Sequence, residues 1–355
     1  MNYLYKLLII NSLSFAASLA AAQSCPNQLE GGVACPTSCM RAPLSVMGDH
    51  MHSQGEWMLS YRHMRSNMQG MRQGSNRAAD SEVASVYNVV PQRMDMQMDM
   101  LGIMYAPSDD LTVMLMAHYH SMEMVNHRMM MGSATPFTTQ SAGWGDTKLS
   151  LLQRLLNSER FQLHAQWGLS LPTGSIKERD LMPAMGGVFA QNILPSSMQL
   201  GSGTFDFEPA LTLLMPRGAL SYGAQIKASL RLESENSQGY RRGHQLQLQS
   251  WASYQLHSDW TVNAGLSYRS SGKLHGEQQS VTKNMMGKRT VPTAWSENYG
   301  GDTLELLVGS FFDLPSTYFP GQRIAVDVRF PLYQDLNGVQ MDADWKCSLG
   351  WELRF

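Results

Sequence analysis

Residues 220–232 read LSYGAQIKASLRL, and this stretch decides the fold class. Its apolar and polar residues alternate: Leu220, Tyr222, Ala224, Ile226, Ala228, Leu230 and Leu232 share one face, and Ser221, Gln225, Lys227, Ser229 and Arg231 share the other. Side chains of a β-strand point alternately to its two faces, so the pattern indicates a strand with one apolar and one polar face. Such a strand is typical of a membrane barrel with lipid outside and water inside.

The same alternation recurs along the chain. It predicts twelve strands, near residues 56–64, 94–106, 111–124, 143–156, 160–171, 203–214, 219–233, 243–256, 259–270, 302–312, 322–331 and 341–355. The long connections, 65–93, 125–142, 172–202 and 271–301, are rich in Gly, Ser, Asn and Pro and are expected to be exposed loops. Short turns alternate with these long loops, as in bacterial outer-membrane barrels. The predicted fold is therefore all-β: a single transmembrane antiparallel β-barrel of about twelve strands, of the outer-membrane type.

The start of the chain predicts export. Lys6 precedes an apolar run from Leu7 to Leu19, and three alanines at 20–22 supply the small residues that a signal peptidase requires. We expect a signal peptide over residues 1–22, an N-terminal arm over 23–54 and the barrel over 55–355, located in the cell outer membrane. The arm lacks strand alternation, so we expect it to lie outside the barrel wall or to fold as a plug.

The end of the chain and its charge bear on its partners. The last predicted strand finishes on Phe355 in a pattern that resembles the C-terminal signal read by the barrel-insertion machinery. After the signal peptide no segment approaches the roughly 18 continuous apolar residues of a membrane-spanning helix, which excludes a helical membrane protein. The net charge of −2 gives no basic surface for nucleic acid. Outer-membrane lipid, the insertion machinery and a transported solute are the expected partners.

The four cysteines leave three interpretations open. Cys25, Cys35 and Cys39 crowd the start of the exported chain, whereas Cys347 stands alone near its end. One disulfide among the first three with a buried free thiol at Cys347 is one interpretation. A thiolate metal site and a lipid anchor on Cys25 are the others.

Four turn motifs occur in order over about 200 residues: GWGD at 143–146, LPTG at 171–174, LGSGT at 200–204 and PLYQDLNG at 331–338. In these motifs the chain resembles a family of outer-membrane transporters named for the MetA pathway of phenol degradation. Two further stretches, GDHMH at 48–52 and GEWMLSYR at 55–62, resemble a Met- and His-rich branch of that family. The resemblance implies a barrel and transport across the outer membrane, and leaves the substrate open.

Methionine and histidine concentrate in one part of the chain. Nineteen of the 27 methionines and six of the ten histidines lie between Met40 and Met131. Leu101, Ile103 and Tyr105 form the apolar face of one strand, and the apolar face of the next carries Leu111, Val113, Leu115, Ala117 and Tyr119. The other face of these strands then points into the lumen. It carries Met94, Met96, Met98, Met100, Met104, Met114, Met116, His118, His120, Met122 and Met124.

A turn at 107–110 would place Met104 opposite Met114 and continue as a ladder to Met94 opposite Met124. Thioethers favour Cu(I) and Ag(I), and imidazole accepts Cu(I) or Cu(II), so this ladder predicts a soft-metal path with copper as cargo rather than as a cofactor. The alternative is that methionine is a flexible apolar filler of the barrel interior.

Two weaker metal sites are also predicted. His50 and His52, with Met51, share a face when extended and lie near Cys35 and Cys39 in the arm, with a polar linker before the first strand as the alternative. A capture site on an outer loop would use His127, Met129, Met130 and Met131, with a hydrophobic loop anchor as the alternative.

Three functions are compatible with these patterns. The first is an outer-membrane channel, transporter or binding protein for a soft metal ion, copper, through the Met/His-lined lumen. The second is a passive channel for small aromatic or hydrophobic compounds. The third is a barrel hydrolase, but the sequence holds no recognisable nucleophile motif, so we expect no enzyme activity.

Overall fold

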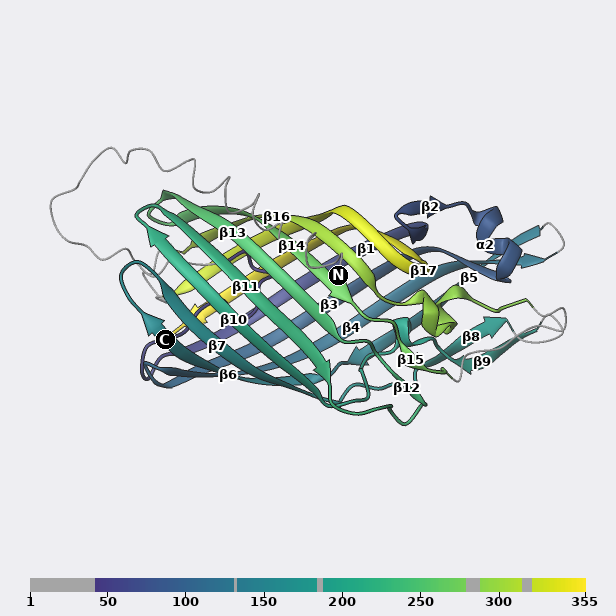
Figure 1. The fold of residues 1–355 in the computed structure, drawn as a ribbon, viewed down its shortest axis with the longest axis horizontal. Helices are drawn as coiled ribbons and strands as arrows, with labels where there is room; N and C mark the ends of the chain where they lie inside the picture. Colours follow the sequence, from purple (N-terminus) through teal and green to yellow (C-terminus); the bar gives the residue numbers. More distant parts are fainter. Residues whose placement is uncertain (1–41, 131–132, 184–187, 279–287, 315–320) are drawn as a thin grey trace, which may run out of the picture. The chain divides into compact units, whose positions relative to one another are not determined.

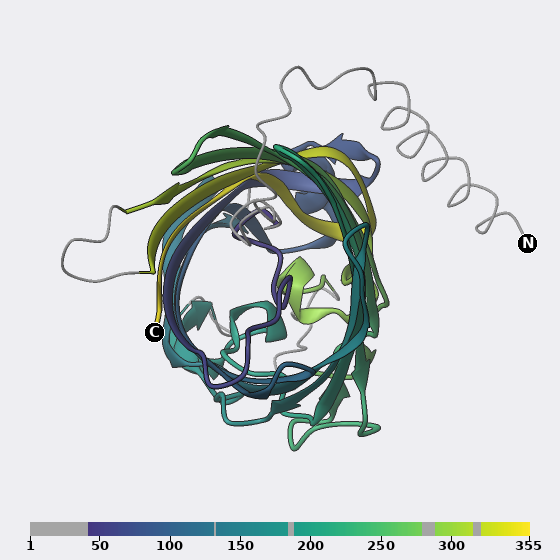
Figure 2. The same ribbon diagram turned by 90° about the vertical axis from the view of Figure 1, so that its left-hand side faces the viewer.

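The computed structural model describes residues 42–130, 133–183, 188–278, 288–314 and 321–355. Within these ranges eleven strand elements pair in a closed antiparallel ring, in which β17 pairs with β1 (Figures 1 and 2). The ring elements are β1 (Trp57–Gly74), β3 (Val89–Ser108), β4 (Leu111–Met130), β6 (Thr147–Asn157), β7 (Gln162–Leu171), β10 (Asp206–Arg217), β11 (Leu220–Arg231), β13 (Gln245–His257), β14 (Trp260–Ser271), β16 (Gly301–Asp313) and β17 (Gln322–Arg354). The fold is thus the predicted outer-membrane type of barrel.

Element β17 crosses the wall twice. Its first part, Arg323 to Leu336, pairs with β16, and its last part, Met341 to Arg354, pairs with β1. The amide of Arg354 donates to the carbonyl of Gly321 at 3.1 Å, which brings the two ends of the element together. Because one of the eleven ring elements supplies two crossings, the described wall has twelve antiparallel segments, in agreement with the sequence prediction.

The two ends of the barrel differ in their connections. At one end the strands join through tight turns such as 109–110 and 218–219, and Trp57 N donates to Phe355 O at 2.8 Å; we call this the short-turn end. The remaining elements belong to the other connections, and we call that side the long-loop end. They are β2 (Asn76–Ala78), α2 (Asp80–Val86), β5 (Ser133–Trp144), β8 (Arg179–Pro183), β9 (Phe189–Ile193), η3 (Ser196–Met198), β12 (Tyr240–Arg241), β15 (His275–Gly276), η4 (Pro292–Ala294) and η5 (Ser296–Asn298).

Alternation determines which side chains face outward. On β11 Ile226 is 45 % exposed, whereas its neighbour Gln225 is buried. On β4 Leu115 is 46 % exposed, while Met114 and Met116 beside it are buried. The outer face of this band is therefore apolar, as a lipid-facing surface must be. No helix among the described residues is long and apolar enough to span a membrane.

The strands extend further toward the long-loop end than the sequence predicts. The segments 65–93 and 125–142, expected as loops, instead continue β1 to Gly74, start β3 at Val89, and run through β4 into β5. The prediction was wrong because the outer face of the extension is polar. In 65–74, for example, Arg65 and Gln69 are exposed, whereas Met71 is buried. A search for apolar-out strands misses such segments.

The segment 42–54 lies inside the barrel and is held from several sides (Figure 2, dark purple). Its backbone carbonyls accept hydrogen bonds from wall side chains: Arg62 to Leu44 at 2.6 Å, Arg329 to Ser45 at 2.7 Å, Gln225 to Met47 at 3.0 Å and His164 to Gly48 at 2.8 Å. Those partners stand on β1, β17, β11 and β7. The segment therefore spans the lumen and ties opposite walls together.

Candidate functional site in the barrel interior

The methionine and histidine side chains form rows across β1, β3 and β4. The pairs of β3 with β4 are Met104–Met114, Gly102–Met116, Met100–His118, Met98–His120, Met96–Met122 and Met94–Met124. This is the register predicted from the 107–110 turn, and it is confirmed. β1 extends the rows, with Arg62 beside Met100 and Met64 beside Met98. Paired residues of antiparallel strands share a face, so each row faces the interior.

Near the short-turn end the methionines pack against the segment 42–54. Met58, Met104, Met114, Met116 and Leu152 form a buried group, and Met47 and Met51 of the segment pack on it. We call this group the lower methionine cluster. All five of its buried side chains are at most 6 % exposed. Here methionine fills irregular space between a wall and a plug, which suits its flexible side chain.

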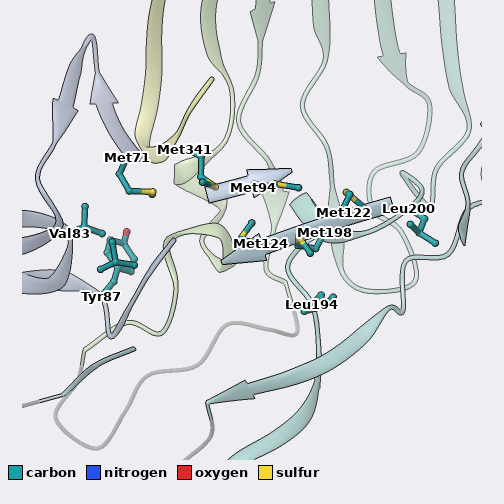
Figure 3. Packing of buried hydrophobic residues seen from close by; sticks show 11 residues of the cluster. Met71, Val83, Tyr87, Met94, Met122, Met124, Leu194, Met198, Leu200 and Met341 are labelled. Atoms are coloured by element: carbon teal, nitrogen blue, oxygen red, sulfur yellow. The ribbon is translucent and has the colours of Figure 1, made fainter. Parts of the chain in front are cut away.

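Near the long-loop end a second group forms the core beneath the loops. Its buried members are Met71, Val83, Tyr87, Val90, Met94, Met122, Met124, Leu194, Met198, Leu200 and Met341, and we call it the upper methionine cluster. Figure 3 shows that Met198 of η3 lies among the strand methionines Met94, Met122 and Met124. Because segments far apart in the chain meet here, these thioethers are packed as in the core of a soluble protein.

Between the two clusters a short zone of the wall stays accessible. We call Met64, Met98, Met100, His118 and His120 the middle zone. His118 is 7 % exposed, but the other four keep intermediate exposure although they face inward. Space for solute or water therefore exists in front of them. Of the predicted ladder, Met98, Met100, His118 and His120 lie in this zone, and Met96 packs against the upper methionine cluster.

The two histidines of the middle zone have defined orientations. His118 Nδ1 lies 3.0 Å from the carbonyl oxygen of Asp146, and the ring donates to it. The His118 and His120 rings are stacked, with centroids 6.3 Å apart and planes inclined by 25°. Gly145 lies against them, since a Cβ at that position would be 2.7 Å from His120 Nε2. Gly145, the second glycine of the GWGD motif, thus makes room for the His120 imidazole.

Asp146, the last residue of that motif, fixes the adjacent loops. One carboxylate oxygen accepts the Gly174 amide at 3.0 Å, and the other accepts the Ser202 amide at 2.7 Å. The motifs that carried the family resemblance at 143–146, 171–174 and 200–204 therefore meet in space. Their role in this structure is to hold loops beside the middle zone.

The strands that flank the methionine strands carry clusters of charged side chains, since β6 pairs with β4 and β17 pairs with β1. Glu208 lies 2.6 Å from Lys148 Nζ and 2.9 Å from Lys227 Nζ. On β16 and β17, Glu305 lies 2.5 Å from Lys346 Nζ and 3.5 Å from Arg329. The sequence prediction did not single out these clusters, although charged residues on the polar faces of the strands were a usable signal. Thioether rows and ionic clusters therefore lie on neighbouring strands of the interior.

The weaker predicted metal residues fall in different places. His50, Met51 and His52 line a cavity of about 110 Å³ at the short-turn end, with His164, Arg154 and Arg354 among the other lining residues. Cys35 and Cys39 lie outside the described residues. In the described part of the chain, no group of three or more His, Cys, Asp or Glu side chains is placed to hold a metal ion.

The predicted capture loop is not a loop. His127 and Met129 continue strand β4, where they pair with Pro136 and Ala134 of β5. Met129 packs against the upper methionine cluster. Of Met130 only the backbone is described, and Met131 lies outside the described residues.

Comparisons with known proteins identify the architecture. The chain superimposes on an outer-membrane channel from Pseudomonas putida F1 with a TM-score of 0.58 and 13 % identity, covering 88 % of this chain and 100 % of that chain. Weaker similarities include a deletion mutant of the monoaromatic hydrocarbon channel TodX (TM-score 0.47, 10 % identity, 86 % and 91 % covered) and the NanC porin (TM-score 0.42, 9 % identity, 83 % and 98 % covered). No family model and no curated protein sequence matches the chain. At these identities the first similarity establishes the fold.

Proposed function

We propose that this protein is an outer-membrane channel for small hydrophobic or aromatic solutes, which bind along the methionines of the middle zone. The observation that carries the proposal is the middle zone, where Met64, Met98 and Met100 face inward and remain partly exposed. An accessible apolar stripe inside a membrane barrel provides binding energy for an apolar solute. The cations on the flanking strands are ion-paired with Glu208 and Glu305, so these three thioethers are the apolar surface offered to a solute.

The barrel similarity supports a channel, and the names of several similar structures fit a hydrophobic solute. That the protein belongs to the phenol-degradation transporter family, and to its Met- and His-rich branch, is likewise a proposal. Passage also requires movement, because the segment 42–54 spans the lumen in this structure.

Cu(I) or Ag(I) is the second candidate cargo, and one observation favours it. Met98 stands opposite His120, and Met100 stands opposite His118, so each row offers one thioether and one imidazole about 5 Å apart at Cβ. The hydrogen bond from His118 Nδ1 to a backbone carbonyl is the kind that orients a metal-binding imidazole. Because the other methionines of the ladder are packed in the two clusters, a metal path along the wall is limited to the middle zone.

A charge placed in the stripe tests the main proposal. Cells that carry Met98→Lys in their outer membrane should take up dilute toluene several-fold more slowly than cells with the parent protein, because the ammonium interrupts the apolar surface. Gln97→Lys is the matched control, since Gln97 neighbours Met98 but faces outward, and its uptake should equal that of the parent. Equal uptake by the Met98→Lys and parent proteins would refute a path for apolar solutes along this wall.

A second variant separates the two cargoes. Replacing His118 and His120 with Leu, and Met98 and Met100 with Ile, preserves volume and apolarity, so the barrel should fold. A solute channel predicts unchanged toluene uptake and unchanged Ag(I) binding by calorimetry. A large loss of Ag(I) binding would favour the metal path instead.

A further inference from the structure

The segment before β1 contains two imidazoles in an ordered arrangement. They are far from the middle zone in the sequence, and the lower methionine cluster lies between the two places. His50 and His52 both line the 110 Å³ cavity at the short-turn end. Their ring centroids are 5.0 Å apart, and the planes are inclined by 70°. Two imidazoles that hold one tetrahedral ion through nitrogens about 2.0 Å from it have ring centres roughly 5 Å apart. The observed spacing therefore suits joint ligation of one cation.

Each ring is oriented by a carboxylate. His50 Nδ1 donates to Asp49 Oδ1 at 2.7 Å, and His52 Nδ1 donates to Glu56 Oε1 at 3.1 Å. With Nδ1 protonated, the ring lone pair resides on Nε2, which becomes the ligating atom. Imidazoles that bind metal ions commonly donate the other ring N–H to a carboxylate, which fixes the tautomer and increases the basicity of the ligand.

The backbone of this segment is held before any ion arrives. Gly48 has a φ of +67°, so a side chain at this position would strain the turn that leads into the two histidines. The Gly48 carbonyl accepts from His164 at 2.8 Å, and the His52 amide donates to Thr112 Oγ1 at 3.2 Å. Ligands fixed in this way lose little conformational entropy on binding.

From these contacts we infer that His50 and His52 form a binding site for one divalent transition-metal cation, with Nε2 of both rings as protein ligands and water at the remaining positions. Among the first-row divalent ions Cu(II) binds such a nitrogen pair most tightly, so it is the appropriate probe. Asp49 and Glu56 are positioning residues in this site, since they act through the rings. The site is independent of the solute proposed above.

Titration of the purified full-length barrel with Cu(II) tests the inference. Calorimetry should show one site that is lost, or weakened at least about tenfold, in a His50→Gln and His52→Gln double variant, and pulsed electron paramagnetic resonance should show two imidazole nitrogens on the parent-bound copper. The control is His257→Gln, an exposed imidazole at the same end, which should bind as the parent does. Parent-like binding by the double variant would overturn the site.

Three further variants test the role of Glu56, provide a single-substitution alternative, and separate this site from copper binding at the middle zone. Glu56→Gln should weaken Cu(II) binding roughly tenfold while the two-nitrogen signal persists, because the tautomer support is reduced and the ligands remain. If the double variant does not fold, His50→Gln alone serves, since that ring is the more exposed of the two. Loss of copper binding in a His118→Gln and His120→Gln variant, with His50 and His52 intact, would assign the site to the middle zone and refute the inference.

Discussion

The membrane band and the extension above it use the same strands in opposite ways. On β4, Val113 and Leu115 face outward in the lower part, while Ser121 occupies an outward position in the upper part. Methionine faces inward in both parts. Outside the lower part lies lipid, and outside the upper part lies water, so the outer face follows the solvent. The surroundings of the inward methionines differ along the strands. The segment 42–54 covers them in the lower part, loops cover them in the upper part, and the space in front of the middle zone is accessible.

Truncating a methionine of the upper cluster should produce the largest effect. Met122→Ala removes a buried side chain whose neighbours come from η3 and from β3, so a cavity is left. We expect a loss of about 2–5 kcal/mol in the free energy of unfolding, measured by urea titration of the barrel in lipid vesicles. Met98→Ala, from the accessible middle zone, should cost clearly less. Equal losses for the two variants would contradict the division into clusters and middle zone.

A charge on the outer face should report where the membrane ends. Leu115→Arg places a cation at a lipid-facing position and should cost about 2–4 kcal/mol, depending on its depth. Ser121→Arg lies on the same strand and the same face, six residues further, and should change the free energy of unfolding by no more than about 0.5 kcal/mol. Both values come from the same vesicle titration. A large penalty at Ser121 would move the membrane boundary above the middle zone.

Acid should weaken the anchoring of the segment 42–54 by a smaller amount. Burial alone would raise the pKa of Glu56, but the Ser53 amide, the His52 ring and Arg354 outweigh it, so the pKa lies below its ordinary value. A carboxylate with a lowered pKa contributes stability above its unfolded pKa, about 4.3, and that contribution is lost as the pH falls through the folded value.

Limited proteolysis of the segment between pH 7 and pH 3, with an acid-active protease below pH 4, measures this effect. Cleavage relative to an unfolded reference peptide should increase in the parent below about pH 4.3 and should depend less on pH in Glu56→Gln. An identical pH profile in both proteins would show that another group controls the segment.

Local pattern was sufficient for the wall and for the ladder register. Alternation in segments such as 220–232 identified the strands, and the short turn at 107–110 fixed the pairing of Met104 with Met114. Local pattern was insufficient for the extension of the strands beyond the membrane. A strand whose outward residues are polar resembles an exposed loop in sequence when the search expects lipid-facing apolar residues. Local pattern was also insufficient for the ionic clusters around Glu208 and Glu305, since partners on neighbouring strands are far apart in sequence.

By itself the sequence determined the barrel, its number of crossings and the inward orientation of the Met/His face, because alternation and turn length act between neighbours in the chain. Only the tertiary structure decided what each inward side chain does. The covering of the upper and lower clusters comes from segments such as 188–202 and 42–54, whose contacts join residues up to hundreds of positions apart. No local periodicity encodes those contacts, since they depend on how the closed wall brings loops and plug into one interior.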